Sequence, residues 1–196
     1  YSALDILQGK APAQKAVQTT TQGDIIPSTP ALAGADAILT ATGKEYRLVE
    51  ALTPLQGAYD YCLLDTPPAL GVLTVNALAA CTGAIIPAQA DVYSLHGIAQ
   101  LYDTLQTIKR YCNPTLKVLG IVLTRYNGRT ILSREVAEQI EQTAAQLDTR
   151  LYRSYIRECI AVKEAQAVKQ SIFEYAPRSN AAEDYGALVN EILEEA

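Results

Sequence analysis

The sequence contains no methionine and no tryptophan, and only one histidine and four cysteines among its 196 residues. A natural reading frame begins with methionine, so we expect this chain to be part of a longer protein. Zinc sites need closely spaced cysteine and histidine ligands, and Cys62, Cys81, Cys112 and Cys159 are too far apart to supply them. We expect four reduced, mostly buried thiols in a cytosolic protein.

The sequence also lacks an excess of positive charge and any long apolar run. Its net charge is −5, so the total charge does not indicate a nucleic-acid partner. No apolar run approaches the roughly 20 residues that a membrane-spanning helix needs. With 49% hydrophobic and 19% charged residues, the composition favours a single well-packed domain over residues 1–196 rather than a disordered or fibrous chain.

Several apolar runs predict strands. The longer ones are YDYCLLD at residues 59–65, GAIIPAQ at 83–89 and KVLGIVLTR at 117–125, and a shorter candidate is DIIPS at 24–28. The longer runs are apolar throughout rather than alternating, which is typical of strands covered on both faces.

Amphipathic patterns between these runs predict helices. They lie at residues 44–52, 94–111 and 133–147, with Ser94 and Ser133 at the start of the second and third. A last helix opens at Asn180, with Glu183 at capping-box spacing, and its apolar face comprises Tyr185, Leu188, Val189 and Ile192. The alternation predicts an α/β fold, a mostly parallel sheet with helices on both faces in three α/β/α layers.

The run at residues 59–65 ends on a single carboxylate, Asp65, and Thr66, Pro67 and Pro68 follow it. In open parallel sheets ligands bind beyond the carboxyl ends of the strands, and an acid at that place can hold a hydrated Mg²⁺. The prolines then restrict the path by which the chain leaves the strand. Spacing alone leaves two interpretations open, because Asp65 could instead cap the next turn.

The stretch YDYCLLDTPPALGVLTVNALAA resembles the Walker B segment of the ParA/MinD/Soj class of partitioning ATPases. Further similar blocks follow the family's order, namely IIPSTPALAGAD, AIIPAQADVYSLHGIAQL, GIVLTRYNGRTILSREV and IRECIAVKEAQAVKQSIFEYAPRSNAAEDYGAL. The resemblance covers essentially the whole chain. It implies a P-loop NTPase of the ParA branch, with ATP and Mg²⁺ as cofactors.

One part of the family pattern is missing. The family's deviant Walker A loop, which is Gly-rich and carries two lysines, precedes every block found here, and its strand lies in the middle of the family's sheet. The only Gly-Lys pairs are Gly9-Lys10 and Gly43-Lys44, and neither is followed by Ser or Thr. Either the loop belongs to a preceding segment or the protein has lost it, and the first explanation is favoured. The chain alone is expected to be inactive as an ATPase.

The resemblance assigns roles to particular residues. Asp65 corresponds to the Walker B acid, which contacts Mg²⁺ through water and takes part in catalysis, and Thr66 and Pro67 adjoin the bound nucleotide. The base-binding positions correspond to Thr124, Arg125 and Tyr126 in one place and to Arg157 and Glu158 in another. Arg157 stands where proline is commonest in the family, which puts base recognition there in question.

A DNA partner is also implied by the resemblance. Residues 109–178 contain 12 Lys or Arg against 7 Asp or Glu, a local positive balance inside an acidic chain. Arg129 matches an arginine that family members use on DNA. A second such arginine corresponds to Ala161, so we expect Lys163 or Arg157 to replace it. The alternative is an ordinary solvated face.

The function implied is DNA partitioning. The protein would bind DNA without sequence preference as an ATP-bound homodimer, respond to a ParB-like centromere-binding protein, and segregate a plasmid, chromosome or mobile element from a cytoplasmic, nucleoid-associated location. The alternative is a non-hydrolysing adaptor that has lost its nucleotide site. A membrane-bound MinD-like role is disfavoured, since the chain ends in EILEEA rather than in a basic amphipathic helix.

Overall fold

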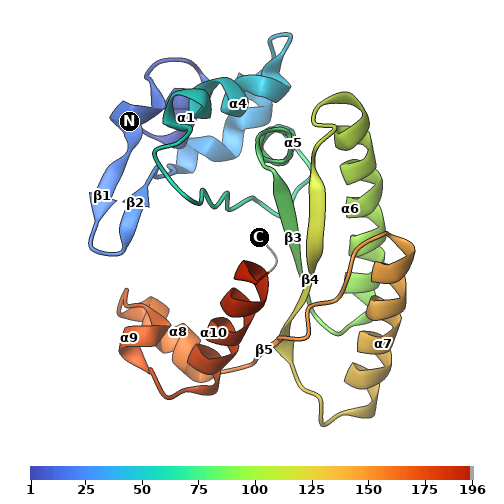
Figure 1. Ribbon diagram of the computed structural model, residues 1–196. Helices are drawn as coiled ribbons and strands as arrows, with labels where there is room; N and C mark the ends of the chain where they lie inside the picture. Colours follow the sequence, from blue (N-terminus) through green and yellow to red (C-terminus); the bar gives the residue numbers. More distant parts are fainter. Residues whose placement is uncertain (195–196) are drawn as a thin grey trace. The chain divides into compact units, whose positions relative to one another are not determined.

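The computed structural model describes residues 1–194 (Figure 1). These residues form two compact units: residues 1–83 with 103–117, and residues 84–102 with 118–194. The expectation of a single domain over residues 1–196 stays a prediction.

The first unit consists mainly of short helices around a small core. Its α-helices are α1 (Ala3–Leu7), α2 (Ala13–Ala16), α3 (Ala35–Ile38), α4 (Arg47–Leu52) and α5 (Val72–Ala80), with 3-10 turns η1 (Pro30–Gly34), η2 (Lys44–Tyr46) and η3 (Thr53–Leu55). The core joins α1, α3 and α5 through a cluster of buried residues, Leu7, Ala35, Leu39 and Val72. The predicted helix at residues 44–52 is therefore confirmed as η2 and α4.

The first unit contains a two-stranded sheet, which is a β-hairpin. Strands β1 (Gln18–Thr20) and β2 (Gly23–Ile25) are antiparallel, with Thr19 opposite Asp24. The phenol of Tyr59 donates a hydrogen bond of 2.6 Å to Asp24 Oδ2, which lowers the pKa of that carboxyl. The strand predicted at residues 24–28 is thus observed as β2 at residues 23–25, where it forms one arm of a hairpin.

The predicted strand at residues 59–65 is wrong in this structure. The segment runs outside any sheet, and the side chain of Leu63 is 93% exposed. A strand is held by hydrogen bonds to a neighbour, and none of residues 1–194 forms a ladder with this segment. Cys62 is consequently exposed, which corrects the expectation of buried thiols, while the other three cysteines are half-buried.

The second unit carries a three-stranded sheet in the order β3-β4-β5, formed by β3 (Gly83–Ala88), β4 (Lys117–Tyr126) and β5 (Ile156–Arg157). β4 and β5 are parallel, with Thr124 paired to Ile156 and Tyr126 paired to Arg157. The strands predicted at residues 83–89 and 117–125 are therefore confirmed, and the apolar middle of β4, Ile121, Val122 and Leu123, is buried.

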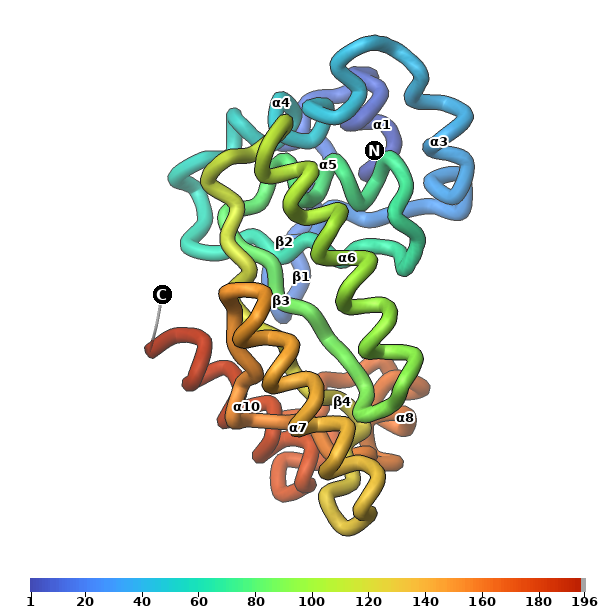
Figure 2. The backbone as a smooth tube through the Cα atoms, turned by 90° about the vertical axis from the view of Figure 1, so that its right-hand side faces the viewer, coloured from blue at the N-terminus to red at the C-terminus, as the bar shows by residue number. Residues whose placement is uncertain are grey.

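Helices cover both faces of this sheet. The first half of α6 (Val92–Tyr111) and α7 (Ile131–Gln146) lie on one face, and α10 (Asn180–Leu193) lies on the other (Figures 1 and 2). Two shorter helices, α8 (Ile160–Ala167) and α9 (Ile172–Tyr175), precede α10. On the α10 side, Leu188 packs with Val122, Tyr152 and Ile156. This arrangement confirms the α/β fold predicted from the sequence.

Four details of the helices differ from the sequence prediction. Asp91 accepts the backbone N–H of Ser94 at 2.8 Å, so α6 begins at Val92 and Ser94 lies inside it. Thr130 rather than Ser133 caps α7, and Ser179 rather than Asn180 caps α10, each accepting a backbone N–H. Within α10, Val189 is 46% exposed rather than buried.

Candidate functional site

Asp65 lies in an exposed position in the first unit. Among residues 1–194 its carboxylate has no hydrogen-bonding partner, which argues against the turn-capping interpretation. Thr66 and Pro67 are also exposed. Asp65 is therefore available to a ligand from solvent, as an acid that contacts a metal through water must be.

The turn that follows Asp65 is fixed by side chains that the sequence did not single out. Thr74 in α5 donates a hydrogen bond of 2.7 Å to the carbonyl of Ala69. Asp36 in α3 accepts the N–H of Val72, the first residue of α5, at 2.9 Å. A Cβ at Gly71 would lie 2.7 Å from Asp36 Oδ2, so only glycine leaves room for this contact. The turn is thus clamped to α3 and α5.

The carboxyl ends of β4 and β5 lie side by side in the second unit and bring together four of the predicted base-binding residues. Thr124 pairs with Ile156 and Tyr126 with Arg157, and a bulge between them places Arg125 in the left-handed region at φ 51°. Arg125 Nη2 then donates to Glu158 Oε1 at 3.0 Å. Tyr126 packs edge-on against Tyr155, with ring centroids 4.8 Å apart.

Glu158 is shared between two cations. Its Oε1 also lies 3.9 Å from Lys163 Nζ, in the first turn of α8. All three side chains are more than half exposed, so this network adds little stability and can rearrange when a ligand arrives. Lys163, predicted for DNA, therefore lies beside two residues predicted for the base.

Arg157, the remaining residue predicted to bind the base, forms an ion pair with Asp184 in α10. Its Nε and Nη2 donate to both carboxylate oxygens of Asp184 in α10, with the shortest distance 2.6 Å, and its backbone N–H donates to Asp184 at 2.9 Å. Glu183 lies 3.5 Å from the same guanidinium. The hydrogen bonds to Asp184 raise the pKa of Arg157 above its ordinary value. Its guanidinium ties β5 to α10, and its role in base recognition stays a prediction.

Arg129 lies in the exposed loop between β4 and α7. Asn127 Oδ1 accepts the backbone N–H of Arg129 at 3.1 Å, which forms the turn that the Asn-Gly pair predicts. Thr130 then caps α7. The loop holds the Arg129 backbone while the residue itself remains exposed.

Within residues 1–194, no three His, Cys, Asp or Glu side chains gather closely enough to hold an ion by themselves. The single exposed carboxylate of Asp65 has the chemistry of a Mg²⁺ ligand, because Mg²⁺ keeps several waters and binds through one or two carboxylates and the phosphates of a substrate. As for membranes, none of the helices in the same part of the chain combines the length and apolar character needed to cross one.

Comparison with known proteins identifies the family. A family profile described as AAA domain matches residues 2–118. The chromosome-partitioning ATPase Soj of Thermus thermophilus is 37% identical over 188 residues, which cover 96% of this chain and 72% of that protein.

Two solved structures are similar in fold. Cobyrinic acid a,c-diamide synthase from Mycobacterium smegmatis, with bound ADP and magnesium, is 36% identical with a TM-score of 0.68, and the match covers 72% of this chain and 59% of that one. A plasmid partition protein of Borrelia burgdorferi bound to AMPPNP has a TM-score of 0.80 at 20% identity, over 100% of this chain and 75% of that one. The fold is that of the P-loop ParA and MinD ATPases. The chain belongs to the ParA/Soj/MinD-type family of partitioning ATPases.

Proposed function

We propose that the complete protein is a ParA-type ATPase that hydrolyses ATP with Mg²⁺ and partitions DNA. In this proposal it binds DNA without sequence preference as an ATP-bound homodimer and acts with a ParB-like partner in the cytoplasm, at the nucleoid. The cargo is a plasmid, a chromosome or a mobile element. The observation that carries the proposal is Asp65, an exposed carboxylate that forms no hydrogen bond with any of residues 1–194 and lies in the segment that resembles the family's Walker B sequence.

ATP and Mg²⁺ are proposed as the cofactors because a relative 36% identical to the chain binds ADP and magnesium. Mg²⁺ would neutralise charge on the phosphates, and Asp65 would hold a water of its hydration shell. Thr66 and Pro67 adjoin that acid in a turn fixed by Asp36 and Thr74. A fixed turn keeps the carboxylate in position, which is the main contribution that a protein makes to phosphoryl transfer.

The ends of β4 and β5 are proposed to hold the base. Thr124, Arg125 and Glu158 lie together there, and the Arg125–Glu158 pair is exposed enough to open. Arg157 would support this site indirectly, since its guanidinium binds Asp184. Arg129 and Lys163 are proposed as contacts to DNA phosphates, because both are exposed cations.

The test is Mg²⁺-dependent ATP hydrolysis by the complete protein and by Asp65→Ala. Turnover should be lost in Asp65→Ala with the melting temperature unchanged, because Asp65 has no hydrogen bond in the fold. The matched control is Asp60→Ala, which removes an exposed acid from the same segment and should keep wild-type turnover. Full turnover in Asp65→Ala would overturn the assignment. Absent hydrolysis in the wild type, with DNA binding retained, would favour the non-hydrolysing adaptor.

A further inference from the structure

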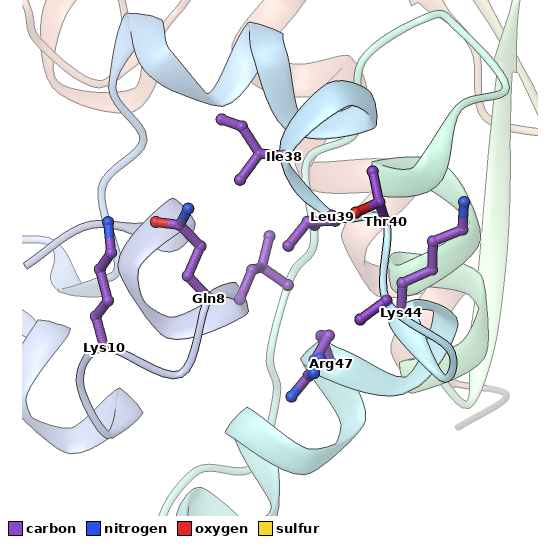
Figure 3. Close-up of a pocket in the computed structure, with 9 residues that line it drawn as sticks. Gln8, Lys10, Ile38, Leu39, Thr40, Lys44 and Arg47 are labelled. Atoms are coloured by element: carbon purple, nitrogen blue, oxygen red, sulfur yellow. The ribbon is translucent and has the colours of Figure 1, made fainter.

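The first unit contains a pocket of about 280 Å³ that the partitioning function does not use. Residues from α1, α3 and the η2–α4 segment line it, as Figure 3 shows: Leu7, Gln8, Lys10, Ile38, Leu39, Thr40, Ala41, Lys44 and Arg47. Leu7 and Leu39 belong to the buried core. Lys10, Thr40, Lys44 and Arg47 supply the polar part of the lining, here called the rim, from different sides of the pocket.

The two Gly-Lys pairs of the sequence, which do not fit a phosphate loop, both contribute to this pocket. Gly9 has φ +71° and Gly43 has φ +79°, in the left-handed region that favours glycine. Each glycine directly precedes one of the two lysines, Lys10 and Lys44, that line the pocket. Lys10 and Lys44 are 34 positions apart in the sequence, and the fold brings them to one hollow.

The rim is held by the buried side chain of Asn76, which is 1% exposed. Its Nδ2 donates to the carbonyl of Lys44 at 2.8 Å, and its Oδ1 accepts the N–H of Leu48 at 3.0 Å. These bonds fasten the segment that carries Lys44 and Arg47 to α5. The cations are therefore attached to a fixed backbone rather than to a loose loop.

The charges on the rim are only partly compensated. Arg47 lies 3.8 Å from Glu50, and the pKa of Asp5 is lowered mainly by hydrogen bonds from Ser2 and to a smaller extent by the charge of Lys10. Neither acid lines the pocket.

We propose that this pocket binds a small phosphate-bearing anion. Two lysines and an arginine supply the charge, and Thr40 supplies a hydroxyl that can donate a hydrogen bond to a phosphate oxygen. The volume lies at the low end of the range of ligand pockets, so the ligand is a phosphate or a compact phosphoester rather than a nucleotide. The phosphate belongs either to a free metabolite or to a nucleic-acid chain.

The experiment is a titration of the complete protein with inorganic phosphate, followed by backbone amide NMR shifts at constant ionic strength. Excess ADP is present, so that the proposed nucleotide site is already filled. The expected result is a saturable shift of the Lys10, Thr40 and Lys44 amides. Lys44→Gln should weaken the affinity about fivefold, as expected for one charge at contact distance from the ligand in a solvated site. Lys15→Gln, an exposed lysine of the same unit outside the pocket, should leave the affinity unchanged.

A second titration with a short DNA duplex identifies the source of the phosphate. Shifts of the same three amides, with weaker binding by Lys44→Gln, would assign the pocket to a nucleic-acid phosphate. Shifts with inorganic phosphate alone would assign it to a free anion. Linear shifts that do not saturate, or equal affinities in Lys44→Gln and the wild type, would overturn the proposal. The wild-type titration does not require any variant to fold. Phosphate binding in this pocket is measured without ATP hydrolysis, so its failure is distinguishable from a failure of the proposed ATPase function.

Discussion

Arg157 and Asp184 form the most extensively bonded ion pair in the second unit, with the backbone and the guanidinium of Arg157 both donating to one carboxylate. The Asp184 side chain is only 10% exposed, whereas that of Arg157 is 38% exposed. The pair joins the last strand of the sheet to the last helix. The backbone N–H of Arg157, which a proline at this position would lack, is part of the contact.

Asp184→Asn is expected to destabilise the protein by about 1–3 kcal/mol, because hydrogen bonds to a charged group are worth roughly that much and Arg157 would lose its counter-charge. Urea unfolding of the complete protein at pH 7 measures the change. Glu183→Gln is the matched control, since Glu183 approaches the same guanidinium from an exposed position and should contribute less than about 1 kcal/mol. Equal effects of the two substitutions would contradict this prediction.

The same pair predicts a pH dependence. Burial alone would raise the pKa of Asp184, but the hydrogen bonds from Arg157 outweigh it and hold the pKa below its ordinary value of 3.8. A group whose pKa is lowered by folding stabilises the native state above its unfolded pKa, and this contribution is lost as the pH falls through the folded pKa. The stability difference between wild type and Asp184→Asn should therefore be constant from about pH 5 to 8 and should shrink below about pH 4. A difference that grows in acid would contradict the assignment.

Gly120→Ala is expected to destabilise the second unit by about 1–3 kcal/mol through overpacking. A Cβ at Gly120 in β4 would lie 2.5 Å from the ring of Tyr152, which is 3% exposed and also carries Arg150 against its face at 4.7 Å. The ring therefore has little freedom to move away. Thermal unfolding of the complete protein tests the prediction.

Gly186→Ala provides the control for this substitution. Gly186 lies inside α10, and a Cβ there meets no atom of residues 1–194 within 4 Å. Alanine should raise the stability by about 0.5–1 kcal/mol, because glycine is a poor helix former. If Gly120→Ala were as harmless as Gly186→Ala, the close packing of β4 against Tyr152 would be refuted.

Asn76→Ala is expected to cost at least about 2 kcal/mol, since it leaves the N–H of Leu48 and the carbonyl of Lys44 without partners. Asn190→Ala removes an exposed asparagine from α10 and should change stability by less than about 0.5 kcal/mol. Chemical denaturation of both variants gives the comparison. Similar small losses in the two would mean that water replaces the Asn76 amide.

The sequence predicted those elements whose stability comes from continuous apolar burial. The runs at residues 83–89 and 117–125 became β3 and β4, and the 3.6-residue periodicity located α6, α7 and α10 within two residues at their starts. The run at residues 59–65 is also largely apolar, yet it is not a strand. Composition reports a side chain's preference for burial, but a strand also needs a neighbour that accepts its backbone hydrogen bonds.

The residues that shape the sites were less predictable. Asp65 was predicted from its place after an apolar run and then from a family resemblance, whereas Thr124, Arg125 and Glu158 came from the resemblance alone, and the structure brings these last three together. Asp36, Asn76 and Asp184 were missed, although each bonds backbone groups far away in the sequence. Single polar side chains that bridge distant segments have no periodicity, so only the folded chain reveals them.

Arg129→Ala should weaken non-specific DNA binding by the ATP-loaded complete protein with little effect on nucleotide affinity. Arg129 is exposed in a loop whose backbone is held by Asn127, immediately before the N-cap of α7. Its guanidinium can therefore reach a phosphate without unfolding anything. Loss of one phosphate contact should reduce the slope of log affinity against log salt by about one unit.

Binding measured across a salt series on two duplexes of unrelated sequence tests this prediction. Because a phosphate contact carries no sequence information, both duplexes should lose affinity alike. Lys15→Ala removes one positive charge from an exposed residue of the first unit and should leave the salt slope unchanged. An unchanged slope in Arg129→Ala would place the DNA contact elsewhere. A loss confined to one duplex would make Arg129 a reader of bases, since only base contacts distinguish two sequences of equal charge.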